Sequence, residues 1–115
     1  MIQEALKGQA LHQTVFEIVA RHLDVERYRC FIFGSEASGE NWPASDLDIG
    51  IMGEQAVDAI VLERIRDELE MVPSLRVFDV VDFADVSAEF RRVALKAVIP
   101  FNGKIAGAEG CSGAL

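Results

Sequence analysis

Two aspartates stand one residue apart near the middle of the chain, in the stretch SDLDIGI at residues 45–51. On an extended backbone Asp46 and Asp48 point to the same face, because side chains alternate along a strand. Two carboxylates held so close repel each other unless a cation binds between them, and magnesium prefers such oxygen ligands. Taken alone, an Asp-x-Asp pair is better interpreted as an ordinary polar strand end.

A third carboxylate comes from the apolar segment RVFDVVDF at residues 76–83. A helix between the two strands allows a parallel crossover, which places Asp48 and Asp79 in the early halves of neighbouring strands. Asp82 competes for the third position, and we prefer Asp79 because it is nearer the start of its strand. Three convergent carboxylates are costly without a partner, so we expect a magnesium site at Asp46, Asp48 and Asp79.

The dipeptide Gly34-Ser35 ends the apolar run YRCFIF at residues 28–33, and ten residues separate it from Asp46. Gly34 permits a sharp turn and close approach to a ligand. Ser35 offers a hydroxyl and, if a helical turn begins there, backbone N–H groups at an anion-binding end. Such a turn would hold the outer phosphates of a nucleoside triphosphate opposite a carboxylate-bound metal. In isolation a Gly-Ser pair indicates only an ordinary turn. The combination of Gly-Ser, ten residues and Asp-x-Asp, however, arises by chance on the order of a few times in a thousand chains of this length.

Hydrophobic periodicity places these residues on a small fold. It predicts helices over residues 3–24, 55–71 and 87–98 and strands over residues 28–33, 47–52 and 76–83. Ser87 is the expected N-cap of the last helix, with Phe90 and Val93 facing inward. The predicted fold class is α+β, with a three-stranded sheet flanked by helices. We assign residues 1–103 to this domain and expect residues 104–115 to be a flexible Gly-rich tail.

Composition narrows the possible partners. The net charge is −8 and the sequence has no basic stripe, which disfavours nucleic acid as a partner. A nucleotide carried with a divalent cation, or a basic protein, is compatible with this charge. No apolar run is long enough to span a membrane. The N-terminus has no pattern of a secretory signal, and Cys30 lies in an apolar run, so we expect a cytoplasmic protein.

The sequence resembles the minimal nucleotidyltransferase family of the DNA polymerase beta superfamily. The matching residues are FIFGS (31–35), Ala37, Gly39, SDLDIGI (45–51) and FDVVDF (78–83). The order of elements over roughly residues 10 to 100 agrees as well. The Gly-Ser and Asp-x-Asp spacing is specific to the superfamily, whereas the third aspartate is a weaker motif.

The resemblance implies a reaction and its residues. Gly34, Ser35, Gly39 and Ser45 would bind the nucleotide, and the three aspartates would bind two magnesium ions. Asp79 would also help to deprotonate an attacking hydroxyl. The reaction would transfer AMP from ATP to that hydroxyl, with release of pyrophosphate.

Family members of about this size are similar to the antitoxins of HEPN/MNT toxin–antitoxin pairs. The resemblance therefore implies a helical HEPN-domain partner encoded beside the gene, with a tyrosine as the acceptor. Two alternatives stay open: a non-catalytic antitoxin that acts by occlusion, and the catalytic subunit of a two-subunit enzyme that modifies a small molecule. Exposed sheet edges also leave homo-oligomerisation open.

One departure from the family pattern concerns the loop that follows Gly34. Relatives often carry arginine at the position of Ser38, and Glu36 and Glu40 flank that position here. A lower positive charge at this loop weakens triphosphate binding, so the departure favours the occlusion alternative, whereas the intact aspartates favour the enzyme.

Overall fold

The computed structural model describes residues 8–39 and 46–101. The elements occur in the following order: α1 (Gly8–His22), β1 (Tyr28–Phe33), α2 (Ser35–Ser38), β2 (Leu47–Gly53), α3 (Ala59–Leu69), β3 (Phe78–Asp82), a 3-10 turn η1 (Phe83–Asp85), α4 (Ala88–Ala94) and β4 (Ile99–Pro100). The predicted tail at residues 104–115 lies outside the described residues.

The sheet has four strands in the order β3-β2-β1-β4. Strand β1 runs antiparallel to β2, and β2 runs parallel to β3. The α+β class is confirmed, but the prediction of three strands is wrong. The fourth strand, β4, pairs Ile99 and Pro100 with β1. Two residues are too short for an alternating pattern to show in the sequence, and a proline is tolerated at a sheet edge because its missing N–H is not needed there.

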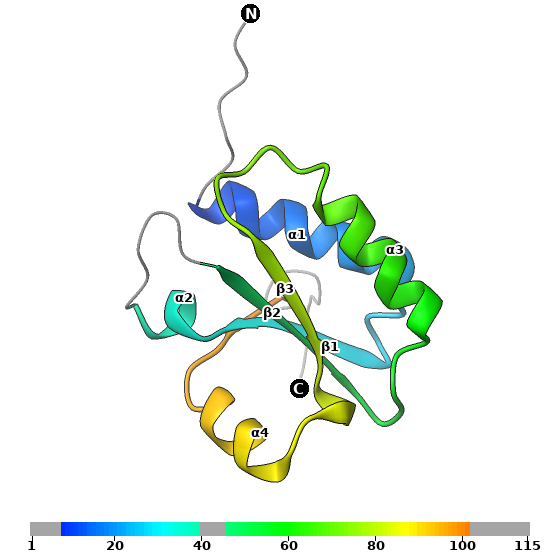
Figure 1. The fold of residues 1–115 in the computed structure, drawn as a ribbon, viewed down its shortest axis with the longest axis vertical. Coiled ribbons are helices and arrows are strands. Elements are labelled where there is room, and N and C mark those ends of the chain that lie inside the picture. The colour runs from blue at the N-terminus through cyan, green and yellow to red at the C-terminus, as the bar shows by residue number, and fades with distance from the viewer. Residues whose placement is uncertain (1–7, 40–45, 102–115) are drawn as a thin grey trace, which may run out of the picture.

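Helices cover both faces of the sheet (Figure 1). On one face α1 and α3 pack against the sheet over the larger hydrophobic core, to which β2 contributes Leu47, Ile49 and Ile51. On the other face η1 and α4 lie over a smaller aromatic core that contains Phe31, Phe33 and Phe83. Since the side chains of β2 alternate, Asp48 and Gly50 point toward this second face.

The parallel crossover from β2 to β3 passes through α3, as predicted. The helix is shorter than the predicted 55–71, because its start is fixed by an N-cap: Asp58 accepts a hydrogen bond from the backbone N–H of Ile60 at 2.8 Å. The residue before this cap, Val57, is buried and donates its own backbone N–H to Asp82. The residues before Asp58 are therefore held outside the helix.

The last helix confirms the predicted N-cap and part of the predicted packing. Ser87 accepts a hydrogen bond from the backbone N–H of Phe90 at 3.0 Å. The helix ends at Ala94 rather than at residue 98. The prediction that Phe90 and Val93 face inward is only partly correct, since they are 41% and 51% exposed. The ring of Phe90 does pack on the aromatic core, with ring centroids 6.0 Å from Phe33 and 5.8 Å from Phe83. A helix of seven residues covers only part of the sheet face, which leaves these side chains at its margin.

None of the helices in the described ranges is both long and apolar enough to cross a membrane.

Candidate active site

Asp48 lies at the centre of the candidate site because its strand, β2, is paired with β1 on one side and with β3 on the other. In the register of the sheet Asp48 is opposite Asp79 on β3 and opposite Phe33 on β1. Asp46 immediately precedes β2 and is exposed, as is Asp79, whereas Asp48 is half-buried. The structure thus places Asp48 and Asp79 side by side on parallel strands, as the crossover predicts.

Gly34 brings the end of β1 directly against Asp48. Its φ is 77° and its ψ is −149°, a backbone conformation that only glycine adopts readily. A Cβ atom on residue 34 would overlap the carboxylate oxygen Oδ2 of Asp48. The glycine is therefore required both by the turn and by the close approach of the backbone to this carboxylate.

The single helical turn α2 follows Gly34. The backbone N–H of Ser38 donates to the carbonyl of Gly34 at 3.1 Å, and Gly39 ends the turn in the left-handed conformation with φ 84°. Within the described residues no side chain caps the start of α2. The predicted helical turn at Ser35 is therefore present, and it begins directly after the glycine that contacts Asp48.

The two candidates for the third carboxylate differ in their surroundings. Asp82 is 6% exposed and accepts hydrogen bonds from the backbone N–H groups of Val57 and Ala84, at 2.7 and 3.0 Å. It also lies on the face of β3 that carries Val80 and the larger core. Asp79 lies on the opposite face, where it is exposed beside Asp48. The structure therefore places Asp46, Asp48 and Asp79 at the same end of the sheet, with Asp48 and Asp79 directly paired, whereas Asp82 holds the backbone before α3.

The charges around Asp48 disfavour its ionised form. Burial raises the pKa of the Asp48 carboxyl, the neighbouring charges of Asp79 and Asp46 raise it further, and the guanidinium of Arg76 partly offsets them. When like charges raise the pKa of a carboxyl group, a bound cation stabilises its ionised form strongly. The concentration of negative charge thus favours binding of a cation next to the carboxylate of Asp48.

The donor chemistry of the three aspartates fits magnesium, which takes carboxylate oxygens together with water and substrate phosphates. Within residues 8–39 and 46–101, however, no group of three Asp, Glu, His or Cys side chains is drawn together as a ready coordination shell. An ion here would thus depend on the substrate for part of its coordination. Ser45, the remaining predicted nucleotide-binding residue, lies outside the described residues.

Comparison with known families identifies this arrangement. A family model described as "Polymerase beta, Nucleotidyltransferase" matches residues 13–101, which is well over half of the chain. The chain belongs to this nucleotidyltransferase family. The resemblance drawn from the Gly-Ser and Asp-x-Asp motifs is thereby confirmed, as is the expectation of an enzyme of this class.

Known relatives of this nucleotidyltransferase agree with the assignment. A protein of Haemophilus influenzae named "Probable protein adenylyltransferase MntA" is 28% identical over 80 residues, which cover 70% of each chain. A solved structure described as "Crystal structure of the toxin-antitoxin with AMP-PNP" has a TM-score of 0.62 at 17% identity, over 81% of this chain and 73% of that one. A second, of a "tri-AMPylated Shewanella oneidensis HEPN toxin in complex with MNT antitoxin", has a TM-score of 0.59 at 15% identity, over 84% of this chain and 73% of that one. At these identities the two structures show the shared fold.

The sequence interpretation missed a charged network beside the nucleotidyltransferase site. Arg76 donates from Nη1 to Glu36 Oε1 at 2.7 Å and from Nη2 to the backbone carbonyl of Asp46 at 3.2 Å. The other oxygen of Glu36 lies 2.7 Å from His12 Nε2. Burial alone would raise the pKa of Glu36, but the hydrogen bonds and charges of Arg76 and His12 outweigh it and lower that pKa. Parallel pairing of β2 with β3 was the available signal, since it brings the residues just before β3 next to Asp46.

A groove opens on the other side of the turn, between α2 and α4. It has a volume of about 380 Å³, and its floor includes Gly34, Ser35 and Ser38. Phe90, Val93 and Lys96 form part of the α4 side. The groove is continuous with the turn that faces the aspartates, and Lys96 contributes a positive charge at its margin.

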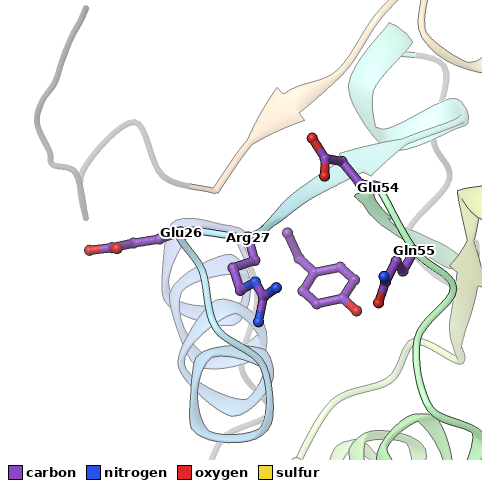
Figure 2. Close-up of a pocket in the computed structure, with 5 residues that line it drawn as sticks. Glu26, Arg27, Glu54 and Gln55 are labelled. Carbon is purple, nitrogen blue, oxygen red and sulfur yellow. The ribbon is translucent and has the colours of Figure 1, made fainter.

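A separate polar pocket lies at the opposite end of β1 and β2. Figure 2 shows that it is bordered by side chains from the turn before β1 (Glu26 and Arg27) and from the loop after β2 (Glu54 and Gln55). Tyr28, which also lines it, pairs with Gly53, whereas Asp48 pairs with Phe33. The two ends are five residues apart along the strand, or about 17 Å at the usual rise. This pocket is therefore remote from the aspartates.

Proposed function

We propose that this protein is a magnesium-dependent nucleotidyltransferase that transfers AMP from ATP to a hydroxyl group of a partner protein. The observation that carries this proposal is the position of Asp48, which is paired with Asp79, preceded by Asp46, and in contact range of the Gly34 backbone. A cluster of carboxylates opposite an uncapped helical turn is suited to a triphosphate with its cation.

The residues of the site have distinct roles in the proposed reaction. Gly34 and Ser35, with Gly39 and Ser45, would bind the phosphates through the loop, and Asp46, Asp48 and Asp79 would hold two magnesium ions. When bound, magnesium stabilises the charge that develops on the attacking and leaving oxygens.

The bond changes are those of a substitution at the α-phosphorus of ATP. The acceptor oxygen forms a bond to the α-phosphorus, and the bond from that phosphorus to the bridging oxygen breaks, so that pyrophosphate leaves. The proton of the acceptor hydroxyl passes to the carboxylate of Asp79, which is exposed and therefore accessible to an acceptor from outside the chain.

The acceptor that we propose is a tyrosine of a HEPN-domain protein, with this chain as the antitoxin of the pair. Support comes from the relative named as a protein adenylyltransferase and from the complex in which a HEPN toxin is AMPylated and bound to an MNT antitoxin.

The test is transfer of label from ATP labelled at the α-phosphate to a co-expressed HEPN-domain protein, in the presence of magnesium. We expect AMP on a tyrosine of that protein, identified by mass spectrometry, and no transfer with Asp46→Asn. Asp67→Asn, a matched change on the exposed side of α3, serves as the control. Equal labelling by Asp46→Asn would refute the assignment of the aspartates.

A second candidate function, an antitoxin that acts by occlusion, is favoured by Ser38. This residue carries no charge, and its hydroxyl donates to the carbonyl of Ser35 at 3.3 Å within α2. Occlusion predicts that the double variant Asp46→Asn, Asp48→Asn still neutralises the neighbouring protein and that calorimetry detects no ATP binding. If the neighbouring protein is not toxic when expressed alone, the two-subunit enzyme for a small molecule becomes the better explanation.

A further inference from the structure

Three segments that are distant in sequence meet beside the aspartates through charged side chains. Arg76 precedes β3, Glu36 belongs to α2, and His12 belongs to α1. The side chains of Arg76, Glu36 and His12 are only 9%, 12% and 15% exposed. The ion pair between Arg76 and Glu36 has so little solvent contact that salt screens it weakly, and His12 adds a hydrogen bond to the same carboxylate. The network is therefore a fixed part of the site.

The guanidinium of Arg76 connects the two halves of the candidate active site. One of its nitrogens holds the main chain of Asp46, at the entrance to β2, and another holds the carboxylate of Glu36 in α2. Glu36 is two residues after Gly34, so the same guanidinium restrains the phosphate-facing turn and the first aspartate. The backbone N–H of Leu47 also donates a hydrogen bond to the carbonyl of Val77 at 2.8 Å, which joins the start of β2 to the residue before β3.

We propose that Arg76 is a positioning residue for nucleotidyl transfer, which sets the separation between the Gly34-Ser35 turn and the aspartates through its simultaneous bonds to Glu36 and Asp46. This inference rests on the proposed function. The planar guanidinium makes two directed bonds at once, which an ammonium group does not reproduce. The charge of Arg76 also partly offsets the rise in the pKa of Asp48 that burial and the other aspartates cause.

The expected effect of losing this restraint is on the rate of transfer. A displacement of about 1 Å between catalytic groups costs on the order of 100-fold in rate. We therefore expect Arg76→Met to lower kcat for label transfer on the order of 100-fold, with a smaller change in KM for ATP. Arg76→Lys retains the positive charge but not the two directed hydrogen bonds of the guanidinium, so most of the fall in kcat should remain. The matched control is Arg64→Met on the exposed side of α3.

A second variant separates positioning from stability. Arg76→Met leaves the carboxylate of Glu36 without its guanidinium, which destabilises the fold. In the double variant Arg76→Met, Glu36→Gln that charge is gone, and the free energy of unfolding should recover in large part. Positioning predicts that kcat stays low in this double variant. If kcat recovers together with stability, or if Arg76→Lys restores the full rate, the inference is overturned.

Mn²⁺ binding, measured by electron paramagnetic resonance, distinguishes a failure of the inference about Arg76 from a failure of the proposed function. If the wild-type chain neither binds Mn²⁺ nor transfers label, the proposed function fails and the inference falls with it. If the wild type does both and Arg76→Met transfers label with an unchanged kcat, only the inference about Arg76 is wrong.

Discussion

The backbone of Gly34 and the carboxylate of Asp48 are in such close contact that residue 34 has no room for a side chain. A Cβ atom there would overlap Oδ2 of Asp48, and the φ of 77° disfavours any L-residue independently. The contact joins the turn at the end of β1 to the central aspartate of β2. The same glycine thus links the predicted phosphate-binding turn and the predicted metal-binding residues.

Gly34→Ala should therefore impair both folding and transfer. Backbone strain of this kind costs about 1–3 kcal/mol, and displacement of Asp48 adds to that cost. Gly39→Ala is the matched control for stability, because Gly39 also has a positive φ of 84° but nothing within 4 Å of the added Cβ. Its cost should be confined to about 1–2 kcal/mol of left-handed strain. Urea unfolding measures both, and an equal loss in the two variants would contradict the contact with Asp48.

Asp79 and Asp82 should separate catalysis from stability. Asp79 is exposed, so Asp79→Asn should change the free energy of unfolding by no more than about 0.5 kcal/mol. If Asp79 accepts the proton of the acceptor, the same variant should reduce label transfer by about 100-fold or more. Asp82 is buried with two backbone donors. Asp82→Asn should cost about 1–3 kcal/mol and leave transfer per folded molecule nearly unchanged.

The opposite pattern, a stable Asp82→Asn variant without activity, would indicate that Asp82 takes part in catalysis in place of Asp79. Transfer assays are made at a temperature well below both unfolding midpoints, with the folded fraction taken from circular dichroism.

Lys96 should contribute to nucleotide binding, because it borders the groove that includes Gly34, Ser35 and Ser38. A mobile ammonium group at the margin of a phosphate site contributes mainly to ground-state attraction, at about 1 kcal/mol for an exposed pair. Lys96→Gln should therefore raise KM for ATP several-fold with little change in kcat. Arg92→Gln is the control, since Arg92 is paired with Glu89 on the exposed side of α4. A change in kcat alone would show that Lys96 acts on the transition state.

The sequence predicted the elements that carry the aspartates because their hydrophobic patterns are local. Leu47, Ile49 and Ile51 alternate with Asp48 and Gly50, and the helix between β2 and β3 allows a parallel crossover. These two features predicted that Asp48 and Asp79 lie in the early halves of neighbouring strands, and the structure adds that they are directly paired. The spacing from Gly34 to Asp46 then brought the turn of β1 to the same end of the sheet.

The features that sequence reasoning missed depend on long-range packing. Pairing of Ile99 and Pro100 with β1 has no local pattern, because two residues show no alternation. The different surroundings of Asp79 and Asp82 also have no local pattern, because the backbone N–H of Val57 that donates to Asp82 comes from 25 residues earlier in the chain. The bonds of Arg76 to Glu36 and Asp46 span 40 and 30 residues, which is beyond the range of any periodicity.

Cys30 should be chemically inert in the folded protein. Its side chain is 3% exposed, and burial raises the pKa of its thiol to about 12. Since the thiolate is the reactive form, Cys30 should react with Ellman's reagent at pH 8 only after unfolding in urea. The chain has two cysteines, so the measurement uses Cys111→Ser, which leaves Cys30 as the single thiol. Rapid reaction without urea would show that β1 is accessible.

The same raised pKa predicts how stability depends on pH. In the unfolded chain the Cys30 thiol titrates near 9.0, whereas in the folded protein it keeps its proton to about pH 12. Below pH 9 both states are protonated and the group has no effect. Between these values the unfolded state binds fewer protons, so stability falls as pH rises, by up to about 1.4 kcal/mol per pH unit. Comparing the slopes of Cys111→Ser with and without Cys30→Ala isolates this effect from other groups. Identical slopes in the two variants between pH 9 and pH 10.5 would show that the thiol titrates normally in the folded state.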